Sequence, residues 1–112
     1  MDINVRKRSQ VQVIQLRGQL RLGDAVDQLT RTLDESLAEG DTRFIINLSE
    51  VAMIDSSGIG LLVRFLASAK RQGGSLKLVN LSLFAQKTLR MVGVLPLFEV
   101  YEDDERAVES FS

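Results

Sequence analysis

The sequence predicts an α/β fold, with a mixed, mainly parallel sheet of about five strands packed against about four helices. Segments with the apolar patterns of strands alternate with segments of helical periodicity, in the order β-β-α-β-α-β-α-β-α. Parallel strands need crossover connections of this kind, and two adjacent strands at the start make the sheet mixed. The length of 112 residues suits one domain, and a hydrophobic content of 45% is enough for a core.

The first half of the chain predicts a hairpin, a helix and a buried strand. Apolar and polar residues alternate over 3–9 and 11–16, as in two half-buried strands joined by a short turn. Helical spacing begins at Asp24, the expected N-cap, and ends at Gly40. The nearly continuous apolar run over 44–48 is typical of a central strand covered on both faces.

The second half predicts further helices and strands in alternation. Each predicted helix has a cap residue or a glycine at one of its ends, and each predicted strand is a short apolar run. The elements are, in order, a helix over 59–71 that ends at Gly73 and Gly74, a strand over 76–79, a helix that Ser82 caps and that ends at Gly93, a strand over 97–101 that follows Pro96, and a helix that Asp103 or Asp104 caps.

Composition excludes several classes of function. The sequence contains no Cys and no His, so thiol chemistry, disulfides, Cys-ligated zinc and a Ser-His-Asp triad are impossible within it. We therefore expect no catalytic residue, no metal site and no cofactor. The formal charge of −1 does not indicate the excess of positive charge that is typical of proteins that bind nucleic acid. No apolar run approaches the ~20 residues that span a bilayer, and no signal peptide is apparent, so a cytoplasmic location without membrane insertion is expected.

The stretch MIDSSGIG, residues 53–60, is the candidate functional motif. It follows the predicted buried strand and opens the predicted helix, and α/β folds gather their sites at the carboxyl ends of strands. The start of a helix also directs free N–H groups and the positive end of its dipole outwards. A phosphate on Ser56 or Ser57 would accept such N–H bonds. Gly58 is expected to keep the approach to the hydroxyl open.

The simplest interpretation of the motif is a capped helix, in which Asp55 or Ser56 is the N-cap and Ser57 is a first-turn residue. Because Ser56 is nearer the strand, we expect Ser56 to cap the helix and Ser57 to present its hydroxyl beside Gly58. Enzymatic motifs do not fit. SSGIG is not G-x-S-x-G, GIG lacks the third glycine of a dinucleotide fingerprint, and RQGGSLK lacks the spacing of a phosphate-binding loop.

From about Val11 to Val108 the chain resembles the STAS domain of bacterial anti-sigma factor antagonists. The resemblance is carried by the buried strand FIINL, then MIDSSGIG, then the GG helix stop and the turn RMVGV, in that order and spacing. It implies a single STAS domain over residues 1–112.

The resemblance also implies a function controlled by phosphorylation. In such antagonists the unmodified domain binds an anti-sigma factor and thereby frees a sigma factor. The anti-sigma factor is usually a serine kinase with a histidine-kinase-like ATPase fold, and it phosphorylates the second serine of the motif, Ser57 here. A metal-dependent serine phosphatase restores the free form, and Asp55 beside the acceptor matters for its modification. The expected partner-binding residues are Arg21, Leu22, Asp55, Ser57 and Ile59.

One departure from the family pattern lies after the second predicted strand. Family members often carry G-E-L-D there, whereas this chain has Gly18, Gln19, Leu20 and Arg21, which removes both acids and reverses one charge. The resemblance leaves a second function open, because STAS-like domains also serve as subunits of membrane transport assemblies and bind a partner there without a phosphorylation cycle. Some relatives are reported to bind nucleotides, but no phosphate loop supports a nucleotide sensor here.

Overall fold

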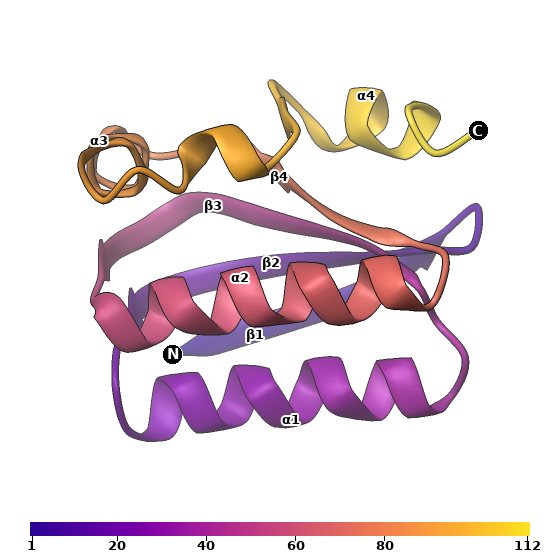
Figure 1. Cartoon of the computed structure of the whole chain (residues 1–112), viewed down its shortest axis with the longest axis horizontal. Coiled ribbons are helices and arrows are strands. Elements are labelled where there is room, and N and C mark those ends of the chain that lie inside the picture. The colour runs from indigo at the N-terminus through magenta and orange to yellow at the C-terminus, as the bar shows by residue number, and fades with distance from the viewer.

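The computed structural model describes residues Met1–Ser112 and contains one five-stranded sheet with four helices (Figure 1). The strands are β1 (Asp2–Arg8), β2 (Val11–Leu20), β3 (Arg43–Ile54), β4 (Ser75–Val79) and β5 (Val100–Tyr101); the helices are α1 (Asp24–Ala38), α2 (Ser56–Arg71), α3 (Leu83–Met91) and α4 (Asp104–Glu109), with a short 3-10 helix at Leu95–Leu97. The sheet order is β1-β2-β3-β4-β5, with β1 antiparallel to β2 and all other pairs parallel. The predicted mixed, mainly parallel sheet with four helices is confirmed.

The sequential strand order determines which face each helix covers. Crossover connections between parallel strands are right-handed, so successive crossovers that advance in one direction place their helices on the same face. The helices α1, α2 and α3 accordingly share one core with the sheet, while α4, which no strand follows, packs on the other face. Figure 1 shows α1 and α2 side by side and α4 across the sheet from them.

Two clusters of buried side chains fill the space between these layers. In the larger cluster, the Phe44 ring of β3 meets the Phe65 ring of α2 edge to face, with ring centroids 4.8 Å apart. The smaller cluster lies under α4 and consists of Val11, Val13, Ile45, Val79, Ala107 and Val108. Because neighbouring residues of β3 belong to different clusters, this strand is covered on both faces, as its apolar run predicts.

Two strands extend further than their sequence pattern predicts. Strand β3 continues past Leu48 to Ile54, and β2 continues past Leu16 to Leu20. The sequence over 49–54 does not show the alternation of apolar and polar residues that is typical of a strand. The reason is that the register of β2 against β3 shifts twice, and such irregularities break the alternation. Because of this extension, the carboxyl ends of the neighbouring strands β2 and β3 lie side by side.

Two helix caps are confirmed, and one is wrong. Ser82 caps α3 by accepting the Ala85 N–H (3.1 Å), and Asp103 caps α4 by accepting the Arg106 N–H (2.8 Å). Asp24 is not the N-cap of α1. Gly23 holds that position with a positive φ of 114°, and the Asp24 carboxylate lies in the first turn, where it complements the helix dipole.

The predicted strand over 97–101 is shorter in the structure. Only Val100 and Tyr101 pair with β4, because a 3-10 helix occupies the three residues before Phe98. Pro96 explains the change, since its fixed φ favours the first turn of a helix and it has no N–H to donate to a sheet. Helix α2 also begins earlier than predicted, at Ser56 rather than at Ile59.

Candidate functional site

The predicted motif lies where β3 passes into α2, directly beside the end of β2. The Asp55 N–H donates to the Leu20 carbonyl oxygen (3.1 Å), which continues the pairing of the two strands. The carboxylate of Asp55 then accepts two backbone N–H groups. Its Oδ1 accepts from Gly58 (2.9 Å), in the first turn of α2, and its Oδ2 accepts from Leu22 (2.9 Å), in the loop after β2. One side chain therefore joins the β3–α2 junction to the β2–α1 loop.

Asp55, and not Ser56, is the N-cap of α2, so the expectation that Ser56 caps the helix is wrong. A carboxylate has two acceptor oxygens and can satisfy N–H groups from two different segments, which a single hydroxyl cannot. Ser56 is instead the first helical residue, with an exposed side chain, and Ser57 follows it, half-buried.

The electrostatics of Asp55 follow from these bonds. The N–H groups of Leu22 and Gly58, with a smaller contribution from the positive charge of Arg21, lower the pKa of its carboxyl below the ordinary value. The carboxylate is therefore charged at neutral pH, and both of its oxygens are already engaged with the backbone.

Gly58 has a packing role that the sequence alone does not reveal. It is buried, and a Cβ atom at this position would lie 2.6 Å from the Leu20 carbonyl oxygen and 2.8 Å from Leu20 Cγ. Its missing side chain lets α2 approach the end of β2 closely. Leu20 is thus a supporting residue that sequence reasoning missed, because its contact depends on the pairing of β2 with β3.

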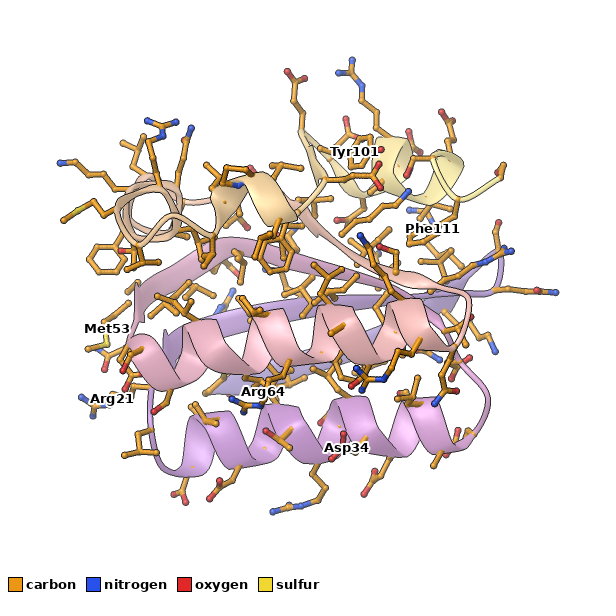
Figure 2. All side chains as sticks on the ribbon, viewed as in Figure 1. Arg21, Asp34, Met53, Arg64, Tyr101 and Phe111 are labelled. Carbon is orange, nitrogen blue, oxygen red and sulfur yellow. The ribbon has the colours of Figure 1, made fainter.

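The structure brings most of the predicted partner-binding residues to one end of the molecule. Arg21 and Leu22 are exposed in the β2–α1 loop, Leu22 with 75% of its surface accessible. Figure 2 shows Arg21 and Met53 at the end where α2 begins. Met53, the first residue of the predicted motif, is half-buried near the end of β3, although the strand was expected to end at Leu48. Ile59 is half-buried and packs against the larger core.

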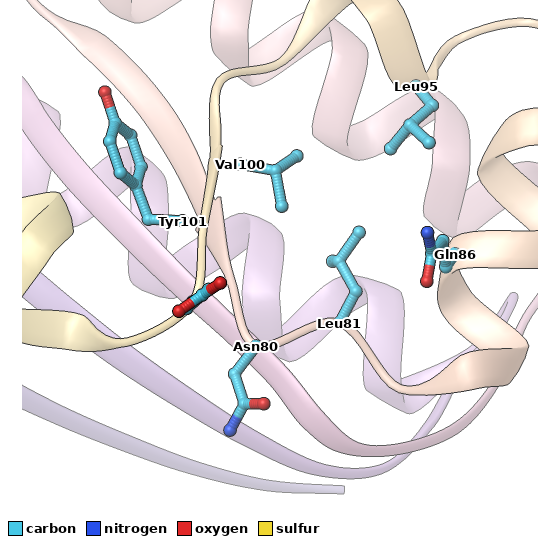
Figure 3. Close-up of a pocket in the computed structure, with 7 residues that line it drawn as sticks. Asn80, Leu81, Gln86, Leu95, Val100 and Tyr101 are labelled. Atoms are coloured by element: carbon cyan, nitrogen blue, oxygen red, sulfur yellow. The ribbon is translucent and has the colours of Figure 1, made fainter.

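One hollow lies away from this motif, at the carboxyl ends of β4 and β5 (Figure 3). It has a volume of about 390 Å³ and is lined by Asn80, Leu81, Gln86, Leu95, Val100, Tyr101 and Glu102. None of the residues predicted for the site lines it. No group of three or more acidic side chains is arranged to hold a metal ion, and no helix is both long and apolar enough for a membrane span.

Comparisons with known proteins agree with this architecture. The family model described as STAS domain matches residues 2–107. The anti-sigma-B factor antagonist of Bacillus subtilis is 34% identical over 73 residues, which cover 65% of this chain and 67% of that protein.

Solved structures match over nearly the whole chain. An anti-sigma-factor antagonist (STAS) domain protein from Planctomyces limnophilus has a TM-score of 0.84 at 26% identity, covering 99% of this chain and 98% of the other. The Bacillus cell fate determinant SpoIIAA in its phosphorylated form shares the fold with a TM-score of 0.77 at 24% identity, covering 99% and 100%. This chain belongs to the STAS domain family.

Proposed function

We propose that this protein is an anti-sigma factor antagonist whose binding to an anti-sigma factor is switched off by phosphorylation of Ser57. The observation that carries the proposal is the D-S-S-G sequence at the start of α2, with Ser57 in the first turn beside the Asp55 cap. The curated relative from Bacillus subtilis is named an anti-sigma-B factor antagonist, and SpoIIAA, which shares this fold, exists in a phosphorylated form.

The chemistry of the modification is supplied by the partner. A serine kinase of the histidine-kinase-like ATPase fold transfers the γ-phosphoryl group of ATP to Ser57 Oγ. The bond from that phosphorus to the ADP leaving oxygen breaks, and the hydroxyl proton is released. A metal-dependent phosphatase later hydrolyses the phosphoserine. The chain itself contributes an acceptor hydroxyl and a binding surface, without turnover of its own.

Local electrostatics account for the switch. A phosphate adds about −1.5 to −2 charges near neutral pH. The first-turn N–H groups of α2 tolerate this charge within the domain, whereas a partner covering Ser57 must desolvate it beside the carboxylate of Asp55. Such a penalty reaches several kcal/mol, and about 1.4 kcal/mol already weakens binding tenfold. Release therefore requires no rearrangement of the fold.

Asp55 supports this switch as a positioning residue. Because both of its oxygens accept backbone N–H groups, it sets the relative position of Ser57 and the β2–α1 loop. The variant Asp55→Asn keeps one acceptor oxygen but presents an NH₂ group to the other N–H. We expect this variant to fold and to be phosphorylated much more slowly than the parent chain.

The test is phosphorylation by the cognate kinase, with the site mapped by mass spectrometry and the affinity for the anti-sigma factor measured for each variant. Ser57→Ala should bind constitutively, and Ser57→Glu should bind weakly.

Ser56→Ala is the matched control. Because Ser56 is not the cap, this variant should keep the parental stability and still accept phosphate. Phosphate on Ser56 alone, or undiminished phosphorylation of Ser57→Ala, contradicts the assignment. Failure of every serine kinase to modify the chain favours the transport-subunit alternative, which has no phosphorylation cycle.

A further inference from the structure

Helix α3 presents large apolar side chains to solvent. It buries Ala85 and Leu89 against the sheet, while Leu83 and Met91 are 85% and 83% exposed and Phe84 is 45% exposed. Neither α1, α2 nor α4 exposes a large apolar side chain to a comparable extent. Single exposed leucines are ordinary on protein surfaces, but several on one short helix indicate an interaction site.

The exposed residues of α3 form one continuous surface. Residues four apart on a helix are neighbours, so Lys87 lies between Leu83 and Met91, and Phe84 and Met91, two turns apart, project in nearly the same direction. We call the set Leu83, Phe84, Lys87, Arg90 and Met91 the α3 surface. Neither Lys87 nor Arg90 takes part in an ion pair in the structure.

Charge along the chain limits what this surface can bind. From Ser56 to Phe98 the sequence has no Asp or Glu, whereas it carries Arg64, Lys70, Arg71, Lys77, Lys87 and Arg90. The occupant that complements the α3 surface is therefore an apolar segment flanked by carboxylates. A second copy of this chain fits less well. A symmetric contact between two α3 surfaces would bring together Lys87 and Arg90 of both copies, and a contact of α3 with the exposed Leu22 beside Asp24 would be an unlike pairing that does not close into a dimer.

The position of α3 connects this surface to the phosphorylation site. The Ser82 hydroxyl, directly before α3, donates to the Val51 carbonyl oxygen (3.0 Å) in the part of β3 that leads to Asp55. Figure 1 shows α3 and the start of α2 at the same end of the molecule. A partner that covers Ser57 can therefore also reach α3.

We propose that the α3 surface is a second docking area for the anti-sigma factor, which contacts it with an apolar segment flanked by acidic residues. This inference rests on the proposed function. The α3 surface adds affinity but does not sense the phosphate, so its contribution is the same whether Ser57 is neutral or charged.

The experiment measures the dissociation constant for the purified anti-sigma factor by calorimetry. We use Leu83→Ser/Met91→Ser and Lys87→Glu, each in the parent and in the Ser57→Glu background. These side chains are exposed, and an unchanged urea midpoint verifies that each variant folds. We expect each change to weaken binding about tenfold, by the same factor in both backgrounds. The control Lys70→Glu makes the same charge reversal on exposed α2 surface at the far end of that helix, and should change the affinity less than about twofold.

The outcomes separate the two proposals. If the parent chain binds the anti-sigma factor and the α3 variants bind equally well, the α3 inference is wrong and the proposed function stands. If the parent chain binds no anti-sigma factor, the proposed function fails and the inference with it.

Two further assays use the chain alone: sedimentation, and flotation with phosphatidylcholine–phosphatidylserine vesicles. Self-association or vesicle binding that Lys87→Glu abolishes would assign the surface to a second copy or to lipid and overturn the proposal.

Discussion

The junction at Asp55 and Gly58 depends on two residues with opposite properties. The carboxylate of Asp55 joins the β2–α1 loop to the first turn of α2. Gly58 has no side chain, which lets α2 approach β2 closely. Both effects act within a few ångströms of Ser57. A substitution at either residue alone therefore tests how much that residue contributes to the stability of this junction.

The glycines of α2 provide a matched pair of substitutions. A Cβ at Gly58 would collide with backbone and side-chain atoms of Leu20, so Gly58→Ala should lower the free energy of unfolding by about 1–3 kcal/mol. At Gly60 the nearest group is the flexible end of Arg64, at 3.1 Å. Gly60→Ala should therefore raise the free energy of unfolding by about 0.5–1 kcal/mol, as alanine favours helix. Urea denaturation measures both, and equal effects would contradict the packing argument.

The lowered pKa of Asp55 predicts a pH dependence of stability. The folded state binds a proton at Asp55 less readily than the unfolded state does, so acidification favours unfolding. The stabilisation by the charged carboxylate is complete above the unfolded pKa of about 3.9 and is lost as the pH falls through the lower folded pKa. The difference in urea midpoint between the parent and Asp55→Asn should therefore be constant near neutral pH and shrink as the pH falls below the unfolded pKa of about 3.9. A difference that does not change over this range would contradict the account.

At the scale of elements, the short helix α4 packs on a small apolar cluster, and a buried lysine anchors the residues that follow it. Lys77 of β4 is 5% exposed, and its Nζ donates to Ser110 Oγ (2.7 Å) and lies 4.0 Å from the centre of the Phe111 ring. Figure 2 shows Phe111 and Tyr101 next to α4. The ammonium group also lies 3.7 Å from the Glu99 carboxylate, so the buried charge is paired, hydrogen-bonded and covered by an aromatic face.

We expect Phe111→Leu to lower the free energy of unfolding by about 1 kcal/mol, because leucine keeps an apolar cover but offers no π-electrons to the Lys77 ammonium. Phe111→Tyr keeps the ring and is the matched control, with stability close to that of the parent. Denaturant unfolding of the three proteins measures the difference. If the leucine and tyrosine variants are equally stable, the ring acts only as apolar cover.

The limits of sequence reasoning are clearest at the ends of elements. Local chemistry predicted the caps at Ser82 and Asp103, because each depends on an N–H only three residues away. The bond between Asp55 and Leu22 spans 33 residues and exists only because β2 and β3 are neighbours. The motif around Ser57 could therefore be found in the sequence, while its connection to the β2–α1 loop could not. The exposed outer face of α3 was also hidden, since its apolar residues look like core until the packing is known.

Considered as a whole, the molecule separates its charges although its formal charge is only −1. The first turn of α1 carries Asp24 and Asp27, and that of α4 carries Asp104 and Glu105, while α2 has only basic charged residues. Ser57 lies at the start of this basic helix. A new negative charge there meets the positive end of the helix dipole, although the Asp55 carboxylate lies beside it.

We therefore expect Ser57→Glu to leave the fold intact. Its urea midpoint should correspond to a stability within about 0.5 kcal/mol of the parent, since the change is local and lies at a helix N-terminus. Amide chemical shifts should differ only in the β2–α1 loop and the first turns of α2. Shifts that spread through the sheet would show that the switch acts by rearranging the fold.

The sequential order of the strands also affects how the protein folds during synthesis. Every strand pairs with the strand before it in the chain, so no later segment must enter between two strands that are already paired. As the chain leaves the ribosome, the hairpin can form first and each crossover can then add one strand to a single growing edge. Only α4, which follows the fifth strand, must return to the far face, where it covers Val11 and Ile45. Until α4 packs there, those side chains stay exposed, so the nascent chain presents an apolar face of its sheet until this helix has been synthesised.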